Sequence, residues 1–201
     1  MSRQYVEHCV GAVTEITTPR RLLMDDAKVS DTDSRRVLAE ARRGSAEAVE
    51  RLVGLCWPDA HRIAYLILRD REEAEDVAQE VMLSLVDRLG ELDPGRRPEP
   101  WVKKVAANRA IDHVRRRRPA EELGAARPAP DVARSDGPVV AALATLEPED
   151  RALIVLRHLL GYRSGEIGKQ MGISAGAVRK RLKRAMDRLR WNLKEGGSDE
   201  D

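Results

Sequence analysis

The sequence predicts an all-α protein made of two small helical domains joined by a flexible linker. The 201 residues include no Phe, and only 3% are aromatic, so Leu, Val, Ile and Ala must form the cores. This composition favours helix packing over a sheet sandwich, which is richer in aromatic and β-branched residues. Apolar residues also recur at helical spacing, and a proline-rich stretch over residues 119–138 interrupts them.

The first 30 residues mix threonine, proline and charges without a sustained apolar period. We expect residues 1–30 to be a variable or disordered extension, and Met24 is a candidate for an alternative start of translation. A first domain is expected over residues 31–118, where the apolar spacing becomes helical. Gly44 should end its first helix and Ser45 should cap the second.

The second helix contains a proline. Because the residue before proline is pushed away from helical angles, the sequence predicts an interruption at Trp57–Pro58. Helical spacing resumes at Ile63. Asp70, followed three residues later by Glu73, resembles a capping box that opens a third helix.

The third helix is predicted to be amphipathic with an acidic outer side. Between residues 71 and 93, eight acidic residues stand against two basic ones. The apolar stripe consists of Ala74, Val77, Ala78, Val81, Leu85 and Leu89. An acidic face suits a basic protein partner and discourages DNA from binding there.

Three prolines and a glycine over residues 93–100 predict a loop. The helix after it is expected to span Trp101 to Arg118, with Pro100 at its first turn and Trp101 in the core. It carries seven basic residues against one acidic. Residues 119–138 have the composition of a linker.

The second domain is expected over residues 139–194, followed by an acidic tail over residues 195–201. An apolar segment over residues 139–146 leads into a helix with Glu147 and Glu149 at its positive end. Gly161 should end that helix. Trp191 is expected to be buried.

Residues 164–189 have the form of a helix-turn-helix. A short helix leads to a turn at Gly172, and Ser174 is placed to cap the longer helix. Gly165 and Gly168 each lower helix propensity by about 1 kcal/mol. The short supporting helix is therefore expected to be soft.

The small net charge of the whole chain does not show how unevenly acidic and basic residues are distributed along it. Lys and Arg number 36 and Asp and Glu number 34, for a net charge of +2. Two basic segments, residues 101–118 and 177–194, each continue a patterned helix. Basic residues that are held on regular helices indicate a polyanionic partner, namely nucleic acid.

Other classes of function are disfavoured. Cys9 and Cys56 are too few for a disulfide framework or a zinc cluster. Apolar runs fall short of the roughly 20 residues of a membrane span and no signal-peptide core is seen, which predicts a cytoplasmic protein without membrane insertion. Asp76 and Glu80, read as metal ligands of a nucleic-acid enzyme, lack a nearby His, Cys or phosphate loop. We predict no enzymatic activity, catalytic residue, metal or cofactor.

Three segments, in order, resemble the RNA polymerase sigma factors of the extracytoplasmic-function (ECF) group of the sigma-70 superfamily. AEDVAQEVMLSLV (residues 74–86) is similar to the helix by which region 2 binds the polymerase clamp. PWVKKVAANRAIDHVRRRR (residues 100–118) resembles the helix that reads and opens the minus-10 element. Residues 146–190 resemble the region 4 domain, whose recognition helix docks on the minus-35 element.

The resemblance implies three sets of site residues. The core polymerase would be bound by Asp76, Gln79, Glu80 and Leu83. The minus-10 element would be bound by Lys103, Asn108, Arg109, Asp112, His113, Arg115 and Arg116. The loop over residues 89–98 would help to hold an extruded base. The minus-35 element would be bound by Ser174, Ala175, Gly176, Ala177, Arg179, Lys180, Lys183 and Arg184.

The leading hypothesis is a sigma factor that binds core RNA polymerase, recognises the minus-10 and minus-35 promoter elements and promotes strand opening for initiation. The resemblance also implies an anti-sigma factor that masks these faces until a signal arrives. The alternative is a helix-turn-helix regulator of transcription that acts without binding the polymerase core. The basic helix over residues 108–118 argues against it, because such a regulator has no need of a second DNA-binding helix.

Overall fold

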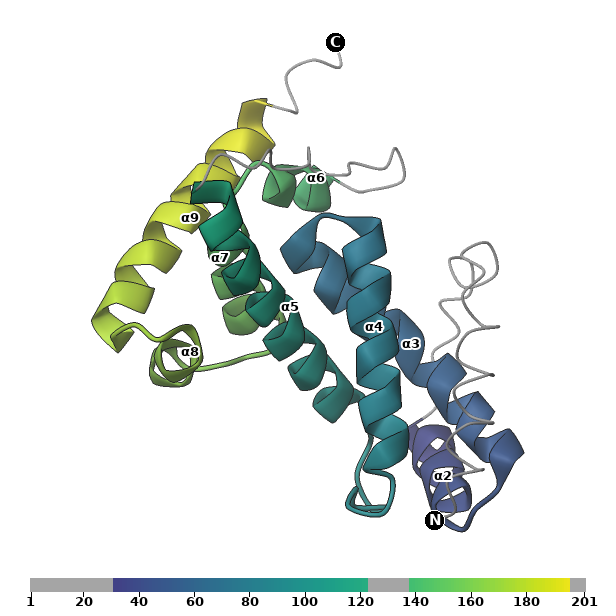
Figure 1. The fold of residues 1–201 in the computed structure, drawn as a ribbon. Helices are drawn as coiled ribbons and strands as arrows, with labels where there is room; N and C mark the ends of the chain where they lie inside the picture. Colours follow the sequence, from purple (N-terminus) through teal and green to yellow (C-terminus); the bar gives the residue numbers. More distant parts are fainter. Residues whose placement is uncertain (1–30, 123–137, 196–201) are drawn as a thin grey trace. The chain divides into compact units, whose positions relative to one another are not determined.

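A computed structural model of the chain describes residues 31–122 and 138–195, and within these ranges its regular structure is helical (Figure 1). The predicted N-terminal extension, most of the predicted linker and most of the acidic tail lie outside the described residues. The elements in order are α2 (Asp31–Arg42), α3 (Ala46–Leu68), α4 (Arg71–Asp87), α5 (Glu99–Glu122), α6 (Pro138–Ala144), α7 (Pro148–Ile154), the π-helix η1 (Val155–Leu159), α8 (Ser164–Met171) and α9 (Ala175–Glu195). The all-α prediction is confirmed.

The chain divides into two compact units. Of the described residues, 31–62 and 75–106 form the first, which holds α2, most of α3 and α4, and the start of α5. Residues 63–74, 107–122 and 138–195 form the second, which holds α6 to α9 together with the end of α3, the start of α4 and the rest of α5.

In the first unit, α2 and α3 are joined by the turn that the sequence predicts. Gly44 has φ 94°, a left-handed angle that glycine adopts without strain. The backbone N–H of Ala48 donates to Ser45 Oγ at 3.2 Å and so caps α3. The core of this unit is aliphatic and includes Leu38, Leu52, Val53, Val81, Met82, Leu85, Leu89, Val102 and Ala106.

The predicted interruption at Trp57–Pro58 is wrong, because α3 runs without a break from Ala46 to Leu68 with Pro58 inside it. Proline within a helix removes one hydrogen bond and costs about 3 kcal/mol. Here the ring is exposed, while Cys56 and Trp57 before it and Ala60 after it are buried. Core packing on both sides outweighs the local preference.

At the start of α4, the backbone N–H of Glu73 donates to Asp70 Oδ1 at 3.0 Å, which confirms the Asp70 half of the predicted capping box. The Glu73 carboxylate itself accepts from Arg117 Nη1 at 2.7 Å on each oxygen. It therefore ties α4 to the distal part of α5.

Helix α5 is longer than the sequence predicts. It begins at Glu99, two residues early, and continues through Pro119 to Glu122. The predicted linker over residues 119–138 therefore begins inside α5. Pro119 has no backbone N–H, so the helix continues past it with one backbone hydrogen bond fewer.

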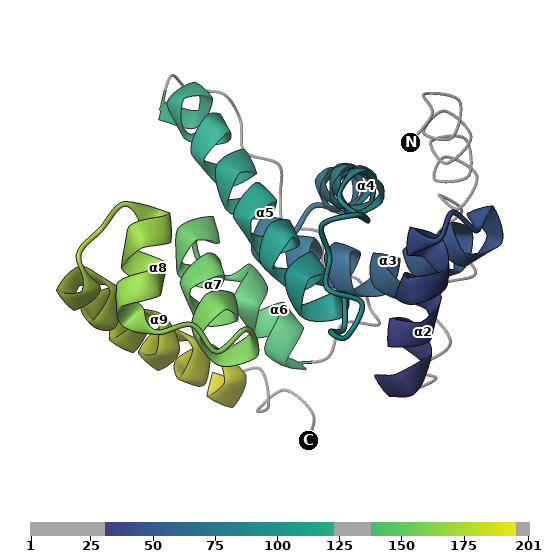
Figure 2. The same cartoon turned by 90° about the horizontal axis from the view of Figure 1, so that it is seen from below.

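In the second unit, α6, α7 and α8 all pack on α9 (Figure 2). Gly161 and Gly172 have φ values of 74° and 69°, so both turns form where the sequence places them. The buried side chains include Leu143, Leu146, Leu153, Leu156, Ile167, Val178, Leu182, Ala185 and Leu189. Trp191, predicted to be buried, is 63% exposed, because it falls outside the stripe that Leu182, Ala185 and Leu189 form on α9.

Candidate nucleic-acid and polymerase interface

The acidic face of α4 lies in the first unit. Asp76 is exposed and Gln79 and Glu80 are partly exposed, while Val77, Ala78 and Val81 point into the core. Leu83 is 38% exposed beside them. All four predicted polymerase-binding residues therefore reach the surface of one helix, and they combine negative charge with one accessible apolar side chain.

Lys103, on the first turns of α5, is predicted to contact DNA. Its Nζ lies 3.1 Å from Asp59 Oδ2 on α3, with both side chains about one third exposed. Its charge is thus partly neutralised by a partner that the sequence pattern did not reveal, because Asp59 stands 44 positions away.

The remaining minus-10 candidates lie on α5 within the second unit. Asp112, Arg115 and Arg116 are exposed, and Asn108, Arg109 and His113 are half-buried. Asn108 accepts a hydrogen bond from the side chain of Gln170 on α8, and Arg115 donates to the Gln170 carbonyl oxygen at 2.7 Å. These two side chains have protein partners that DNA would have to replace.

The helix-turn-helix is built from α8, the turn at Gly172 and α9. The backbone N–H of Ala177 donates to Ser174 Oγ at 3.1 Å, which confirms the predicted cap of α9. Ile167 and Val178 are fully buried and lock the two helices together. The front of α9, from Ala175 to Ala177, carries only small side chains.

The basic side chains of α9 divide between the side that packs on the protein and the side that faces solvent. Arg181 turns inward and donates to Asp150 Oδ1 on α7, at 3.1 Å from Nε and 2.8 Å from Nη2. The predicted DNA-binding cations are all exposed: Arg179, Lys180, Lys183 and Arg184. Arg179 and Lys183, and likewise Lys180 and Arg184, are four positions apart and so share one side of the helix.

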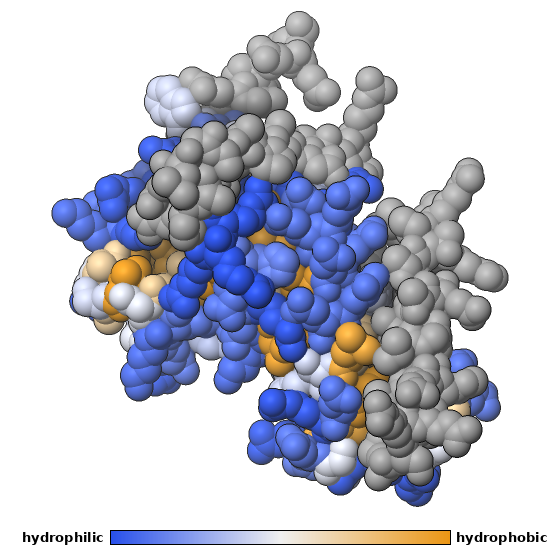
Figure 3. Space-filling view, in the orientation of Figure 1, coloured by the Kyte–Doolittle hydropathy of each residue, from blue (hydrophilic) through white to orange (hydrophobic). Residues whose placement is uncertain are grey.

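In residues 31–122 and 138–195, no three His, Cys, Asp or Glu side chains lie close enough to hold a metal ion together. Across the same residues, no helix has the length and apolar character needed to cross a bilayer. Among the coloured residues, the face seen in Figure 3 is mainly hydrophilic, with small hydrophobic patches between hydrophilic side chains.

The chain matches two family models. Residues 52–120 match Sigma-70 region 2, and residues 137–189 match Sigma-70, region 4. These matches cover the acidic helix, the basic helix and the helix-turn-helix.

Relatives of the chain include RNA polymerase sigma factors. The chain is 32% identical over 163 residues to the RNA polymerase sigma factor CarQ of Myxococcus xanthus, which covers 77% of this chain and 94% of CarQ. It is 31% identical over 173 residues to the ECF RNA polymerase sigma factor SigL of Mycobacterium tuberculosis, which covers 78% of this chain and 98% of SigL.

A solved structure has the same fold. CnrH, in complex with the cytosolic domain of CnrY, superimposes with a TM-score of 0.50 at 24% identity, covering 81% of this chain and 97% of CnrH. The two matched regions, in their order along the chain, and the near-complete coverage of CarQ and SigL give one conclusion. This chain is an RNA polymerase sigma factor of the ECF group of the sigma-70 family.

Proposed function

We propose that the chain divides polymerase binding and promoter recognition among three helices. The acidic face of α4 binds core RNA polymerase, the basic helix α5 binds the minus-10 element and holds it open, and α9 docks on the minus-35 element. The observation that carries this proposal is the segregation of exposed charge. Acidic side chains surround the accessible Leu83 on α4, while α5 and α9 expose arginines and lysines.

The side chains of α4 suit a protein partner. Asp76 and Glu80 are four positions apart, Gln79 lies beside them, and Leu83 continues the same side of the helix. Complementary charge speeds and orients association, whereas a desolvated apolar side chain supplies binding energy. The face repels DNA, so it is free for the polymerase while the other helices hold the promoter.

The proposed docking of α9 on the minus-35 element rests on which of its basic side chains are exposed. Arg181 braces α9 on α7 through Asp150, and the outward Arg179, Lys180, Lys183 and Arg184 are left to contact phosphates and base edges. Phosphate contacts set the register of the helix, and contacts to base edges in the major groove supply sequence preference.

Strand opening without ATP requires the protein to capture bases that leave the stack, at a cost of a few kcal/mol each. Asn108 and Asp112 lie one turn apart on α5 and offer amide and carboxylate groups to such bases. Arg109, Arg115 and Arg116 provide cations for the adjacent phosphates. The helix thus supplies both the chemistry that recognises bases and the charge that holds the opened strand.

We also place the chain in the cytoplasm, where core polymerase and promoters are found, under the control of an anti-sigma factor. Support comes from the fold shared with CnrH, which was solved with the cytosolic domain of CnrY. A partner that covered α4 and α9 would block polymerase and DNA together.

The assignment of α5 is tested by permanganate reactivity of thymines around the minus-10 element. Holoenzyme with the wild-type chain should make these thymines reactive. Asn108→Ala should reduce that reactivity while binding of the chain to core polymerase is retained. Arg188→Ala, which removes an exposed cation from the distal part of α9, is the matched control and should behave as wild type. Equal reactivity of the Asn108 variant would contradict the assignment.

A further inference from the structure

The loop between α4 and α5, residues 88–98 (the α4–α5 loop), is tied to α2 by one side chain. Arg42 is the last residue of α2. Its Nη1 donates to the carbonyl oxygen of Leu92 at 2.5 Å, and its Nη2 donates to the carbonyl oxygen of Gly90 at 2.9 Å. A guanidinium is suited to this task, because its planar fork presents two parallel donors at a fixed spacing.

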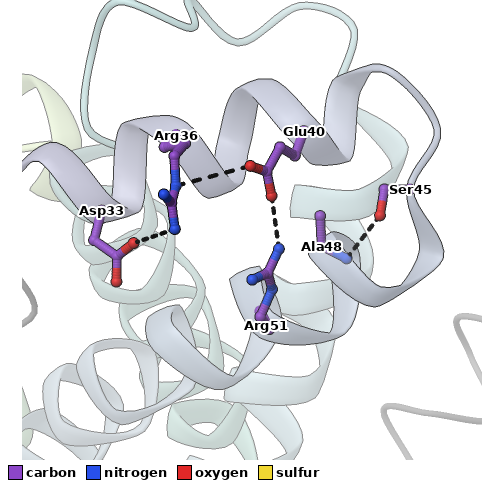
Figure 4. A network of polar contacts seen from close by, with 6 residues as sticks. All are labelled: Asp33, Arg36, Glu40, Ser45, Ala48 and Arg51. Carbon is purple, nitrogen blue, oxygen red and sulfur yellow. Dashed lines mark hydrogen bonds and ion pairs between the residues drawn. The ribbon is translucent and has the colours of Figure 1, made fainter.

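Helix α2 is a firm base for this tie. Leu38 is fully buried and Val37 is 2% exposed. On the polar side, Glu40 Oε2 lies 2.6 Å from Arg51 Nη2 on α3 (Figure 4). The end of α2 from which Arg42 extends is therefore anchored by buried apolar side chains and joined to α3 by an ion pair.

The loop has local order of its own but a long exposed span. The backbone N–H of Leu92 donates to the carbonyl oxygen of Arg88 at 3.2 Å, and that of Gly95 donates to Asp93 Oδ1 at 2.8 Å. Leu89 and Pro98 are buried at its two ends, and residues 90–97 between them are exposed apart from the partly buried Leu92. The two bonds from Arg42 join the middle of this span to α2. At its far end, Arg97 pairs with Glu99, the first residue of α5.

The loop leads directly into the basic helix. Glu99 begins α5, and Arg96 at the exposed turn of the loop has a side chain that is 85% accessible. A loop that is ordered before DNA arrives loses less conformational entropy on binding than a mobile one. The orientation of this loop therefore affects how α5 and its preceding turn meet the opened strand.

We infer that Arg42 is a positioning residue for promoter opening: it holds the α4–α5 loop in a fixed orientation against the opened minus-10 strand, without contacting DNA itself. This inference rests on the proposed role of α5. It adds α2, which lies outside the helices that carry the charge pattern, to the apparatus that opens the promoter.

Three variants test it in the full-length chain. Arg42→Ala removes both bonds. Arg42→Lys keeps the positive charge but not the two-pronged donor. Arg43→Ala removes a neighbouring exposed cation and is the matched control for charge. Hydrogen exchange of peptides from residues 88–98 measures the order of the loop, and permanganate reactivity on a promoter mapped with the wild-type chain measures opening by the holoenzyme.

We expect Arg42→Ala to raise loop exchange and lower promoter opening by about fivefold or more, since charged hydrogen bonds to backbone are lost. Affinity for core polymerase and the melting temperature should stay close to wild type, because Arg42 is exposed. Arg42→Lys should retain most of the defect, and Arg43→Ala should show none.

Several results would overturn the inference. Unchanged exchange in Arg42→Ala would show that the loop does not depend on this tie. Faster exchange with normal opening would show that loop order does not matter to opening. A defect of equal size in Arg43→Ala would assign the effect to net charge. Failure of the proposed function is distinguishable, because the wild-type holoenzyme itself would then fail to open the promoter.

Discussion

The position that a Cβ atom of Gly168 would occupy lies 2.6 Å from the carbonyl oxygen of Ile173. The chain closes tightly here, since the backbone N–H of Ile173 donates to the carbonyl oxygen of Gly168 at 3.0 Å across the left-handed Gly172. The glycine that helix propensity marks as a weakness is thus required by the packing of α8 on the turn.

Gly168→Ala is therefore expected to destabilise the chain by about 1–3 kcal/mol, as is usual for overpacking, although alanine is the better helix former. Urea unfolding of the full-length chain measures this. Gly165 is the matched control on the same helix, because a Cβ there meets nothing within 4 Å. Gly165→Ala should be neutral or stabilising by up to about 1 kcal/mol. Stabilisation by both substitutions would contradict the packing argument.

Variants of α4 should separate polymerase binding from promoter choice. Asp76→Ala and Leu83→Ala are each expected to weaken binding to core polymerase by about tenfold, through loss of complementary charge and of apolar contact respectively. Titration of labelled chain with core polymerase measures the affinity. Both side chains are exposed, so the unfolding transition should not move.

Glu50→Ala is the control for these variants, since Glu50 is an exposed acid on α3 and not on α4. It should bind core polymerase normally. At saturating polymerase, the α4 variants should initiate at the same start sites as wild type. A change of start sites would place α4 in DNA recognition.

On α9, Arg179→Ala and Lys180→Ala should weaken holoenzyme binding to promoters that carry the minus-35 element by about tenfold each. A variant that loses a phosphate contact should also reduce the slope of log affinity against log salt by about 1. Binding measured at several salt concentrations gives both quantities. Arg188→Ala should change neither, and an equal effect of that variant would mean that only the net charge of the helix matters.

Cys56 should be chemically silent in the folded chain. Burial, and then the nearby carboxylates of Glu99 and Asp59, raise the pKa of its thiol far above the ordinary value of 9.0. The thiolate is the reactive form. In a Cys9→Ser variant, a thiol reagent in mildly alkaline buffer should react with Cys56 only after denaturation, and fast reaction of the native chain would contradict the buried assignment.

The raised pKa of Cys56 also makes the stability of the chain depend on pH in the alkaline range. Because the pKa of Cys56 is raised in the folded state, its contribution is intact below pH 9.0, the ordinary pKa. Above that pH the unfolded chain releases a thiol proton that the folded chain keeps, so the free energy of unfolding falls as the pH rises. Urea unfolding of Cys56→Ala at a series of alkaline pH values should show a shallower fall.

The helices and their caps follow from local sequence, and for that reason they could be predicted. Ser45, Asp70 and Ser174 each cap a helix where the pattern places them. The interruption predicted at Pro58 is wrong, because the packing on both sides of Pro58 depends on residues distant in sequence.

The candidate site was predictable as a set of helices and less so as a set of side chains. Arg179 and Arg181 differ little in sequence context, yet one is exposed and the other pairs with Asp150. Lys103 likewise finds Asp59 on another helix. Such partners depend on tertiary contacts, which a charge pattern along one helix does not contain. The tie from Arg42 to the α4–α5 loop went unpredicted for the same reason, since it joins a side chain to carbonyl groups that every residue carries.

The most direct test of the account is reconstitution of the purified chain with core RNA polymerase from its source, followed by size-exclusion chromatography and run-off transcription on genomic promoter fragments. A stable complex that yields specific transcripts with new start sites is the result that the account predicts. No complex, together with salt-sensitive DNA binding by the chain alone, would contradict it and leave the acidic face of α4 without a partner.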